Sequence, residues 1–362
     1  MNKNVVLRIA SILVVGAIGG SPGAYGASTF ADITDTGSLS TAKVALGVWD
    51  FGNLNVDSGV TTNGGSSSFN GTSTGPRSLG IAFRFPDGTL RDATSPGCLC
   101  EGWGVSGGSA SGSAAVDAPV GGVTPGVVNL TLDSFTSTPT SAVSTTHLTS
   151  LPGLTVKQDY HLSSSPSLFE DTVTITNNTG GTVTDVRYRR SMDWDIPPTE
   201  FSELVTHGGV AAALGVPTFG NPKLITSCDN GFEGADPLGV CDAIVGGTTN
   251  TDFVKAGPAD HGSSFIFGFG DFLDGESVTF DIFYGAADTS ADALAILAAV
   301  GAEVYSLGNC NPAASTACTD ITYAFGFKGV GGTPVTVPEP GSLALFGLAA
   351  AGLVAIRRRK AA

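Results

Sequence analysis

The stretch "VRYRRSMDWDI" (residues 186–196) decides the fold class, because its side chains alternate in character along an extended chain. One face of such a strand would carry Val186, Tyr188, Met192, Trp194 and Ile196. The opposite face would carry Asp185, Arg187, Arg189, Ser191, Asp193 and Asp195. This alternation with period two predicts a long central strand, with one face in a core and an exposed ladder of charges on the other.

Arg190 is the exception in this stretch, because it falls on the apolar face of the predicted strand. A buried guanidinium group needs a carboxylate partner. Glu200 and Glu203 lie close by in the sequence, and we expect one of them to pair with Arg190.

Shorter runs on both sides of this stretch alternate in the same way. They are "LGIAFRF" (79–85), "VVNLTLD" (127–133), "DTVTIT" (171–176) and "SVTFDIFY" (277–284). Many such strands predict a mainly β fold, an antiparallel β-sandwich that is either one large unit or two smaller ones. A soft boundary at residues 151–153 would separate an N-terminal β region (27–150) from a C-terminal β region (151–335).

One soluble helix is predicted near residues 290–305, in "SADALAILAAVGAEVYSL" (290–307). Ser290 is the expected N-cap, and Asp292 lies in the first turn, where a carboxylate is favoured. The helix follows directly on the 277–284 strand, so we expect it to pack against the sheet.

The segments between the strands are rich in glycine, serine and threonine. Two Gly/Ser-rich stretches, 59–75 and 104–126, predict surface loops. "NNTGG" (177–181) predicts a hairpin loop between the flanking strands. "GVSGG" (104–108) matches the nucleophile motif G-x-S-x-G, but no helical pattern follows it, so we interpret it as a chance match.

The composition limits the classes of function. The chain has 362 residues, a net charge of −15 and only 17 basic residues, six of which lie in the two ends of the chain. The body is therefore strongly acidic, which excludes nucleic acid as a partner because phosphates require basic residues. The acidity fits solubility outside the cell, and calcium binding is the alternative interpretation.

The first 26 residues are typical of a secretory signal peptide, which the mature protein lacks. Lys3 and Arg8 supply the positive start, and residues 9–18 form a short apolar stretch. Small residues at Ala24 and Gly26 predict cleavage after Gly26.

The C-terminal segment 337–360 has three parts in a fixed order. "VPEP" (337–340) precedes an apolar stretch, residues 342–356, and four basic residues follow it. About fifteen helical residues span roughly 22 Å, which is short for the apolar core of a bilayer. The basic end would stay in the cytoplasm, so this transmembrane helix suits a segment held briefly at the membrane and then removed.

This tail resembles the PEP-CTERM sorting signal of Gram-negative bacteria. The residues that carry the resemblance are Val337, Pro338, Glu339, Pro340, Arg357, Arg358, Arg359 and Lys360. The resemblance implies cleavage by an exosortase-type membrane protease, transient residence in the inner membrane, and delivery to the cell envelope or the extracellular matrix. It also implies a setting of exopolysaccharide and biofilm. "PGCLCEGWGV" (96–105) and "YRRSMDWDI" (188–196) together resemble bodies of uncharacterised secreted PEP-CTERM proteins.

An even number of cysteines in an exported chain favours disulfides. The six candidates are Cys98, Cys100, Cys228, Cys241, Cys310 and Cys318. We favour Cys228–Cys241 and Cys310–Cys318, because each closes a short loop. Cys98 and Cys100 then either pair with each other or act separately. No CxxC motif is present and the four histidines are scattered, so we predict no cysteine–histidine metal site.

The charged face of residues 186–196 is the candidate ligand face. Arg187 or Arg189 would bind an anionic or hydroxyl-rich group, and Asp193 and Asp195 would hold calcium or sugar hydroxyls. Asp193 with Glu200 could also act in glycoside hydrolysis, but the sequence does not give their separation.

Three functions follow from these observations. The first is a structural or adhesive protein of the envelope or matrix, which contacts exopolysaccharide or surface proteins and has no enzymatic activity or cofactor. The second is a carbohydrate- or calcium-binding module, and the third is a secreted enzyme that acts on glycans. The sequence favours the first.

Overall fold

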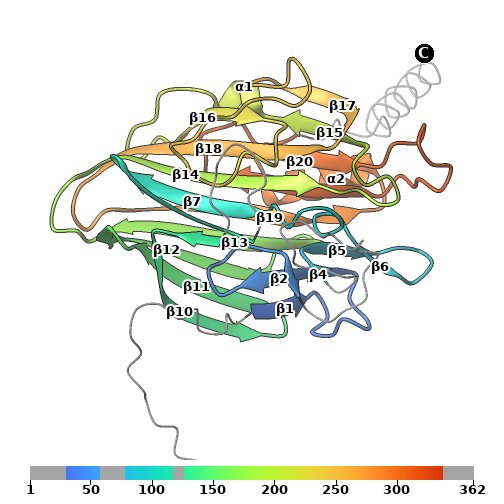
Figure 1. Cartoon of the computed structure of the whole chain (residues 1–362), viewed down its shortest axis with the longest axis horizontal. Coiled ribbons are helices and arrows are strands. Elements are labelled where there is room, and N and C mark those ends of the chain that lie inside the picture. Colours follow the sequence, from blue (N-terminus) through green and yellow to red (C-terminus); the bar gives the residue numbers. More distant parts are fainter. Residues whose placement is uncertain (1–29, 58–77, 117–125, 337–362) are drawn as a thin grey trace, which may run out of the picture.

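The computed structural model describes residues 30–57, 78–116 and 126–336. The predicted signal peptide, the sorting tail and the whole 59–75 stretch lie outside the described residues. The described chain is mainly β, and its named strands pair antiparallel, as the sequence predicts. Two large sheets face each other in a sandwich, with two smaller sheets in the N-terminal part of the described chain (Figure 1).

The first large sheet has six strands in the order β16-β18-β14-β7-β8-β9. They are β16 (Lys223–Cys228), β18 (His261–Phe272), β14 (Val183–Trp194), β7 (Gly102–Gly107), β8 (Ala110–Ala115) and β9 (Gly126–Val128). The stretch quoted first above forms most of β14, which lies between β18 and β7. The prediction of a long central strand is therefore confirmed.

The second large sheet has nine strands in the order β10-β11-β12-β13-β19-β21-β20-β15-β17. They are β10 (Leu130–Thr138), β11 (Ser141–Leu148), β12 (Leu151–Leu162), β13 (Leu168–Asn177), β19 (Ser277–Ala287), β21 (Thr322–Lys328), β20 (Val304–Asn309), β15 (Glu203–Gly208) and β17 (Phe253–Ala259). The predicted boundary at residues 151–153 falls at the β11–β12 hairpin, so strands from both sides of it share this sheet.

Two smaller sheets complete the N-terminal part. Their strands are β1 (Phe30–Thr34), β2 (Val44–Trp49), β5 (Ile81–Arg84) and β6 (Leu90–Asp92), with the pair β3 (Val56–Asp57) and β4 (Ser78–Leu79). The side chains of Ile33, Leu46 and Phe83 are buried in the same core as the large sheets. The N-terminal part therefore packs as an extension of the sandwich.

Aromatic side chains fill the space between the two large sheets. Tyr188 of β14 meets Phe280 of β19 with ring centroids 5.0 Å apart, and Phe267 of β18 meets Phe327 of β21 at 4.7 Å. These pairs lie on the inward faces that the period-two pattern predicts. Each aromatic ring buries a large apolar area, so these contacts dominate the packing of the sandwich.

Two helices occur among the described residues, α1 (Val210–Ala213) and α2 (Ser290–Val300). The predicted helix is α2, and its Leu297 is buried with Phe283 and Ala324 of the nine-stranded sheet. The N-cap is Thr289 and not Ser290, because Thr289 is the extended residue whose hydroxyl accepts a hydrogen bond from the Asp292 backbone N–H.

Two loop predictions are wrong. The "NNTGG" segment does not close a hairpin, because β13 and β14 belong to different sheets and the segment carries the chain from one to the other. Much of the 104–126 stretch forms β7 and β8 in place of a surface loop. Small residues suit these strands because other segments pack closely against them: a Cβ atom at Gly104 of β7 would lie 2.1 Å from the Ala235 carbonyl oxygen.

The predicted partner of Arg190 is also wrong. The guanidinium Nε donates to Glu101, which directly precedes β7, and both side chains are fully buried. Further donors of Arg190 reach the Gln158 Oε1 atom at 2.8 Å and the Tyr160 hydroxyl at 3.0 Å, both on β12. Arg190 therefore connects the six-stranded sheet to the nine-stranded sheet. Glu203 is engaged elsewhere, as described below.

We predict that Glu101→Gln lowers the free energy of unfolding by about 3–5 kcal/mol, because it leaves the buried Arg190 guanidinium without its closest anionic partner. Chemical denaturation of the purified protein measures this change. Asp185→Asn is the matched control, because it breaks the half-exposed Asp185–Arg187 pair and should cost less than about 1 kcal/mol. Equal losses in the two variants would contradict the central role of the Arg190–Glu101 pair.

Candidate functional site

The charged face of β14 is not an exposed ladder. Arg187 and Asp185 are partly exposed and form an ion pair with each other at 2.6 Å. Arg189, Asp193 and Asp195 are at most 1% exposed. The sequence prediction of an exposed ladder is therefore wrong, and the four residues of the candidate ligand face have different surroundings.

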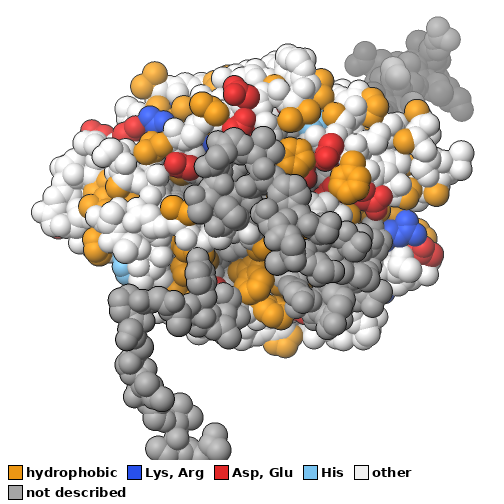
Figure 2. Space-filling model, viewed as in Figure 1, with side chains coloured by type: hydrophobic (Ala, Val, Ile, Leu, Met, Phe, Trp, Pro, Cys, Tyr) orange, Lys and Arg blue, Asp and Glu red, His pale blue; other side chains and the backbone are white. Residues whose placement is uncertain are grey.

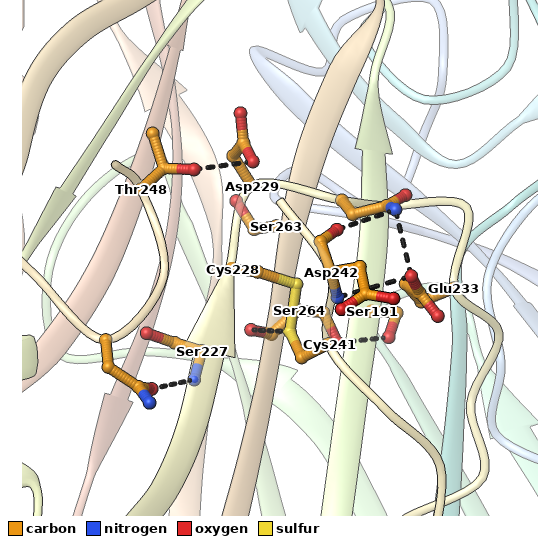
Figure 3. The surroundings of a disulfide bond; sticks show 12 residues. Ser191, Ser227, Cys228, Asp229, Glu233, Cys241, Asp242, Thr248, Ser263 and Ser264 are labelled. Carbon is orange, nitrogen blue, oxygen red and sulfur yellow. Dashed lines mark hydrogen bonds between the residues drawn. A yellow bond between two sulfur atoms is a disulfide. The ribbon is translucent and has the colours of Figure 1, made fainter. Parts of the chain in front are cut away.

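The chain between β16 and β17 covers this face of β14. The Ser191 hydroxyl donates to the Gly234 carbonyl oxygen at 2.9 Å, and Arg189 Nη1 donates to the Asp236 carbonyl oxygen at 3.2 Å. The Cys228–Cys241 disulfide ties the covering segment to the end of β16, and Figure 3 shows this bond beside Ser191. Period-two alternation defines a second face of a strand, but it does not say whether a loop covers that face.

The Arg189 side chain lies beneath the covering segment and is held by hydrogen bonds within the protein. Its Nε donates to the Ser264 hydroxyl at 2.9 Å, and burial lowers the pKa of its guanidinium to about 10. The negative charges of Glu233 and Asp236 oppose that shift. Arg189 is therefore positioned to hold the covering segment in place.

Three aspartates gather where β14 ends and β18 begins. Asp193 is in β14, Asp195 follows that strand, and Asp260 is the single residue between β17 and β18. The pairing of Asp193 with Gly262 and of Trp194 with His261 brings these segments together. One carboxylate oxygen from each aspartate lies within 4.8 Å of the other two. We call these three residues the carboxylate cluster.

Two of the three carboxylates are buried without full hydrogen bonding. Asp195 Oδ2 accepts a hydrogen bond from the Gly97 backbone N–H at 3.0 Å. The Oδ1 atoms of Asp193 and Asp195 have no partner among the described residues. The Cys98 sulfur lies 3.4 Å from Asp193 Oδ2, but it is bonded to Cys100 and has no proton to donate. Asp260 is exposed and opens the cluster to solvent.

Glu203 of β15 lies beside the carboxylate cluster. Its Oε1 accepts from the His261 backbone N–H at 2.9 Å and its Oε2 from the Ser202 backbone N–H at 3.0 Å. Burial outweighs these hydrogen bonds and, with the charges of Asp195 and Asp260, raises the pKa of Glu203 to about 9. Burial and neighbouring carboxylates likewise raise the pKa values of Asp193 and Asp195 well above their usual range.

No ion pair among the described residues joins these four carboxyl groups to a lysine or arginine side chain. Carboxylates that crowd together without a cation either keep their protons or bind a metal ion. The cluster can therefore share protons or hold a hard cation through oxygen ligands.

A buried polar cluster with histidines was missed by the sequence analysis. His261 Nδ1 lies 2.8 Å from Asp229 Oδ2, and His207 Nε2 lies 2.8 Å from the Ser263 hydroxyl. Ser263 donates onward to the Ser306 hydroxyl at 2.6 Å, and its side chain is fully buried. These groups connect strands within the core. Strand pairing, which sequence spacing does not reveal, brings the scattered histidines together.

The disulfide pairs agree with the pairing favoured above. The structure joins Cys228 to Cys241 and Cys310 to Cys318, and it also joins Cys98 to Cys100. The Cys228–Cys241 bond anchors the segment that covers β14, and the Cys98–Cys100 bond borders the carboxylate cluster. Figure 3 shows the surroundings of Cys228–Cys241, with Asp229 and Thr248 joined by a hydrogen bond nearby.

A second candidate surface is the outer face of the nine-stranded sheet. Its partly exposed threonines, which we call the threonine face, are Thr145, Thr155, Thr172, Thr174 and Thr279. Thr174 and Thr279 lie opposite each other on β13 and β19, with hydroxyls 3.0 Å apart, and Lys157 lies opposite both Thr145 and Thr174. This arrangement places hydroxyl groups of neighbouring strands side by side on the outer face, with charged side chains such as Lys157 and Asp281 between them.

The comparisons identify the tail of the chain. Residues 336–360 match the family model of the PEP-CTERM protein-sorting motif. The match confirms the resemblance stated above and shows an exported protein that is processed by a membrane exosortase and sorted to the cell surface. No curated protein matches this chain. Within residues 30–57, 78–116 and 126–336, no helix has the length and apolar character needed to cross a membrane.

We predict that protein stripped of divalent cations loses stability as the pH rises from about 4 toward 9. Below pH 4 the cluster carboxyls are protonated in both states, whereas at higher pH the unfolded chain ionises while the raised pKa values keep the folded groups protonated. Each group contributes up to about 1.4 kcal/mol per pH unit. Asp195→Asn should reduce this slope, because it removes one such group.

Urea unfolding in chelator at several pH values measures the slope. Asp288→Asn is the control, because Asp288 is exposed and forms only a surface pair with Lys43. The control should retain the slope of the native protein. An unchanged slope in Asp195→Asn would contradict the assignment of the effect to the carboxylate cluster.

Proposed function

We propose that this protein is a structural or adhesive component of the Gram-negative cell envelope or extracellular matrix, without enzymatic activity of its own. In this role the body contacts exopolysaccharide or other surface proteins. The PEP-CTERM sorting motif at residues 336–360 carries the proposal, because it directs the chain to the surface where such contacts are made.

The threonine face supports the part of the proposal that concerns polysaccharide. Hydroxyl groups repeated along neighbouring strands offer many weak hydrogen bonds to a hydroxyl-rich polymer, and these add up along a repeating chain. The sheet beneath is rigid because β12, β13 and β19 are paired over long registers. Acidic side chains are more frequent than basic ones on the coloured part of the face in Figure 2, which fits solubility outside the cell.

We predict that the protein outside the native host lacks both Met1–Gly26 and the residues from near Pro340 onward. Intact mass measured separately on inner membrane, outer envelope and medium tests this expectation. Pro338→Ala combined with Glu339→Ala should leave the tail attached and shift the protein to the inner membrane, because it removes the central residues of the motif. A full-length chain in the medium would overturn sorting by cleavage.

We predict that the purified mature protein sediments with exopolysaccharide from its host, and that Thr174→Lys combined with Thr279→Lys weakens this binding at least fivefold. Two long charged side chains would disrupt the paired hydroxyls of the threonine face without entering the core. Thr316→Lys, in the exposed loop between β20 and β21, is the matched control. Equal binding by both variants would contradict the threonine face as the contact surface, and no binding by the native protein would contradict the polysaccharide partner.

A further inference from the structure

We propose that the carboxylate cluster is a calcium site, with Asp193, Asp195 and Asp260 as its protein ligands. This inference is independent of the threonine face and of the structural or adhesive role. It concerns a second surface of the molecule, where β14, β15 and β18 meet.

The size of the cluster matches calcium. The three candidate ligand oxygens lie within 4.8 Å of one another. Calcium takes oxygen ligands at about 2.3–2.6 Å, so two ligands on opposite sides of the ion lie up to about 5 Å apart. Magnesium requires about 2.0–2.1 Å and near-octahedral geometry, keeps several of its waters and is usually bound by only one or two protein carboxylates, so a set of three carboxylates favours calcium. An all-carboxylate set also disfavours softer metals, which prefer imidazole and thiolate.

The unpaired oxygens are the second observation that points to a ligand. Asp193 and Asp195 are at most 1% exposed, and the Oδ1 atom of each has no hydrogen-bond partner among the described residues. Burying a carboxylate without a donor or cation is costly. Elsewhere on the same strand, the buried charge of Arg190 is neutralised by an ion pair with Glu101. A bound cation would supply the corresponding partner for the two aspartates.

The surroundings hold the ligands in fixed positions. The Gly97 backbone N–H binds Asp195, and a Cβ atom at Gly97 would lie 2.8 Å from both carboxylate oxygens of that residue. A Cβ atom at Gly262 would lie 2.7 Å from the Asp193 Cα atom, so β18 approaches β14 closely there. The aspartates are therefore preorganised by the backbone and need little ordering when an ion binds.

Glu203 and Asp260 have different roles in this arrangement. Both oxygens of Glu203 accept backbone hydrogen bonds, so Glu203 lies beside the site and is not counted among the ligands. Asp260 is exposed, so an ion can enter from its side, and water can complete the six to eight ligands that calcium requires. Extracellular calcium modules have dissociation constants of about 10⁻⁴–10⁻³ M, and we expect this range here.

The test uses the purified mature protein after treatment with EGTA. Titration calorimetry with CaCl2 at pH 7.5 should show one calcium ion per chain, and MgCl2 should bind at least tenfold more weakly. Saturating calcium should raise the thermal unfolding midpoint by about 5 °C, because it binds only the folded chain. No heat of binding together with no shift of the midpoint would overturn the proposal, as would preferential binding of magnesium.

Two variants locate the site. Asp195→Asn should weaken calcium binding at least tenfold, while its midpoint in EGTA should equal or exceed that of the native protein, because folding no longer has to bury a carboxyl group that is ionised in the unfolded chain. Asp260→Asn lies on the exposed side, so it should fold normally and also weaken binding at least tenfold. Asp288→Asn, on the surface beside Lys43, should bind as the native protein does. Native affinity in both cluster variants would overturn the assignment.

Discussion

The buried pair of Arg190 and Glu101 is the interaction on which the rest of the structure depends. Arg190 points from β14 into the core, where its remaining donors meet Gln158 and Tyr160 of the opposite sheet. It also donates to the Gly52 carbonyl oxygen of the N-terminal part at 3.2 Å. A charge in this position is tolerated only if its partners are all in place, so it selects one arrangement of both sheets and the N-terminal part.

The two halves of β14 treat charge in opposite ways. In the first half, the fully buried Arg190 pairs with Glu101, and Arg189 donates to the Asp236 backbone carbonyl and the Ser264 hydroxyl. In the second half, Asp193 and Asp195 are buried to the same extent, yet the described residues supply no cation for them. The same strand therefore contains buried cations that have acidic or polar partners and buried carboxylates that have no cationic partner. Burying a carboxylate without a cation is costly, so a bound cation would stabilise the fold most at this end of the strand.

The sequence predicts the strands well because alternation is a local property. Residues 277–284 have the predicted faces, the apolar face of residues 186–196 lies in the core as predicted, and α2 lies where its helical pattern begins. The predictions that are wrong concern contacts between residues that are far apart in the sequence. The "NNTGG" segment has the composition of a hairpin but joins two sheets, and Arg190 pairs with a residue 89 positions away and not with a nearby glutamate. The sequence identifies Asp193 and Asp195 as possible calcium ligands. Asp260 can be added to them only from the structure, because the register of β14 and β18 places it beside them.

Whether the disulfides form and the proposed calcium site fills depends on the compartment to which the sorting tail directs the protein. Disulfides such as Cys228–Cys241 form and persist in oxidising surroundings, and a calcium site of the expected affinity fills only where calcium is abundant. The Cys98–Cys100 bond borders the carboxylate cluster, so a disulfide and the proposed calcium site lie next to each other at the end of β14. Before export, the covering segment would lack its cross-link and the aspartates their ion. The body would therefore gain part of its rigidity only after crossing the membrane, which is where a surface protein must bear contact with its surroundings.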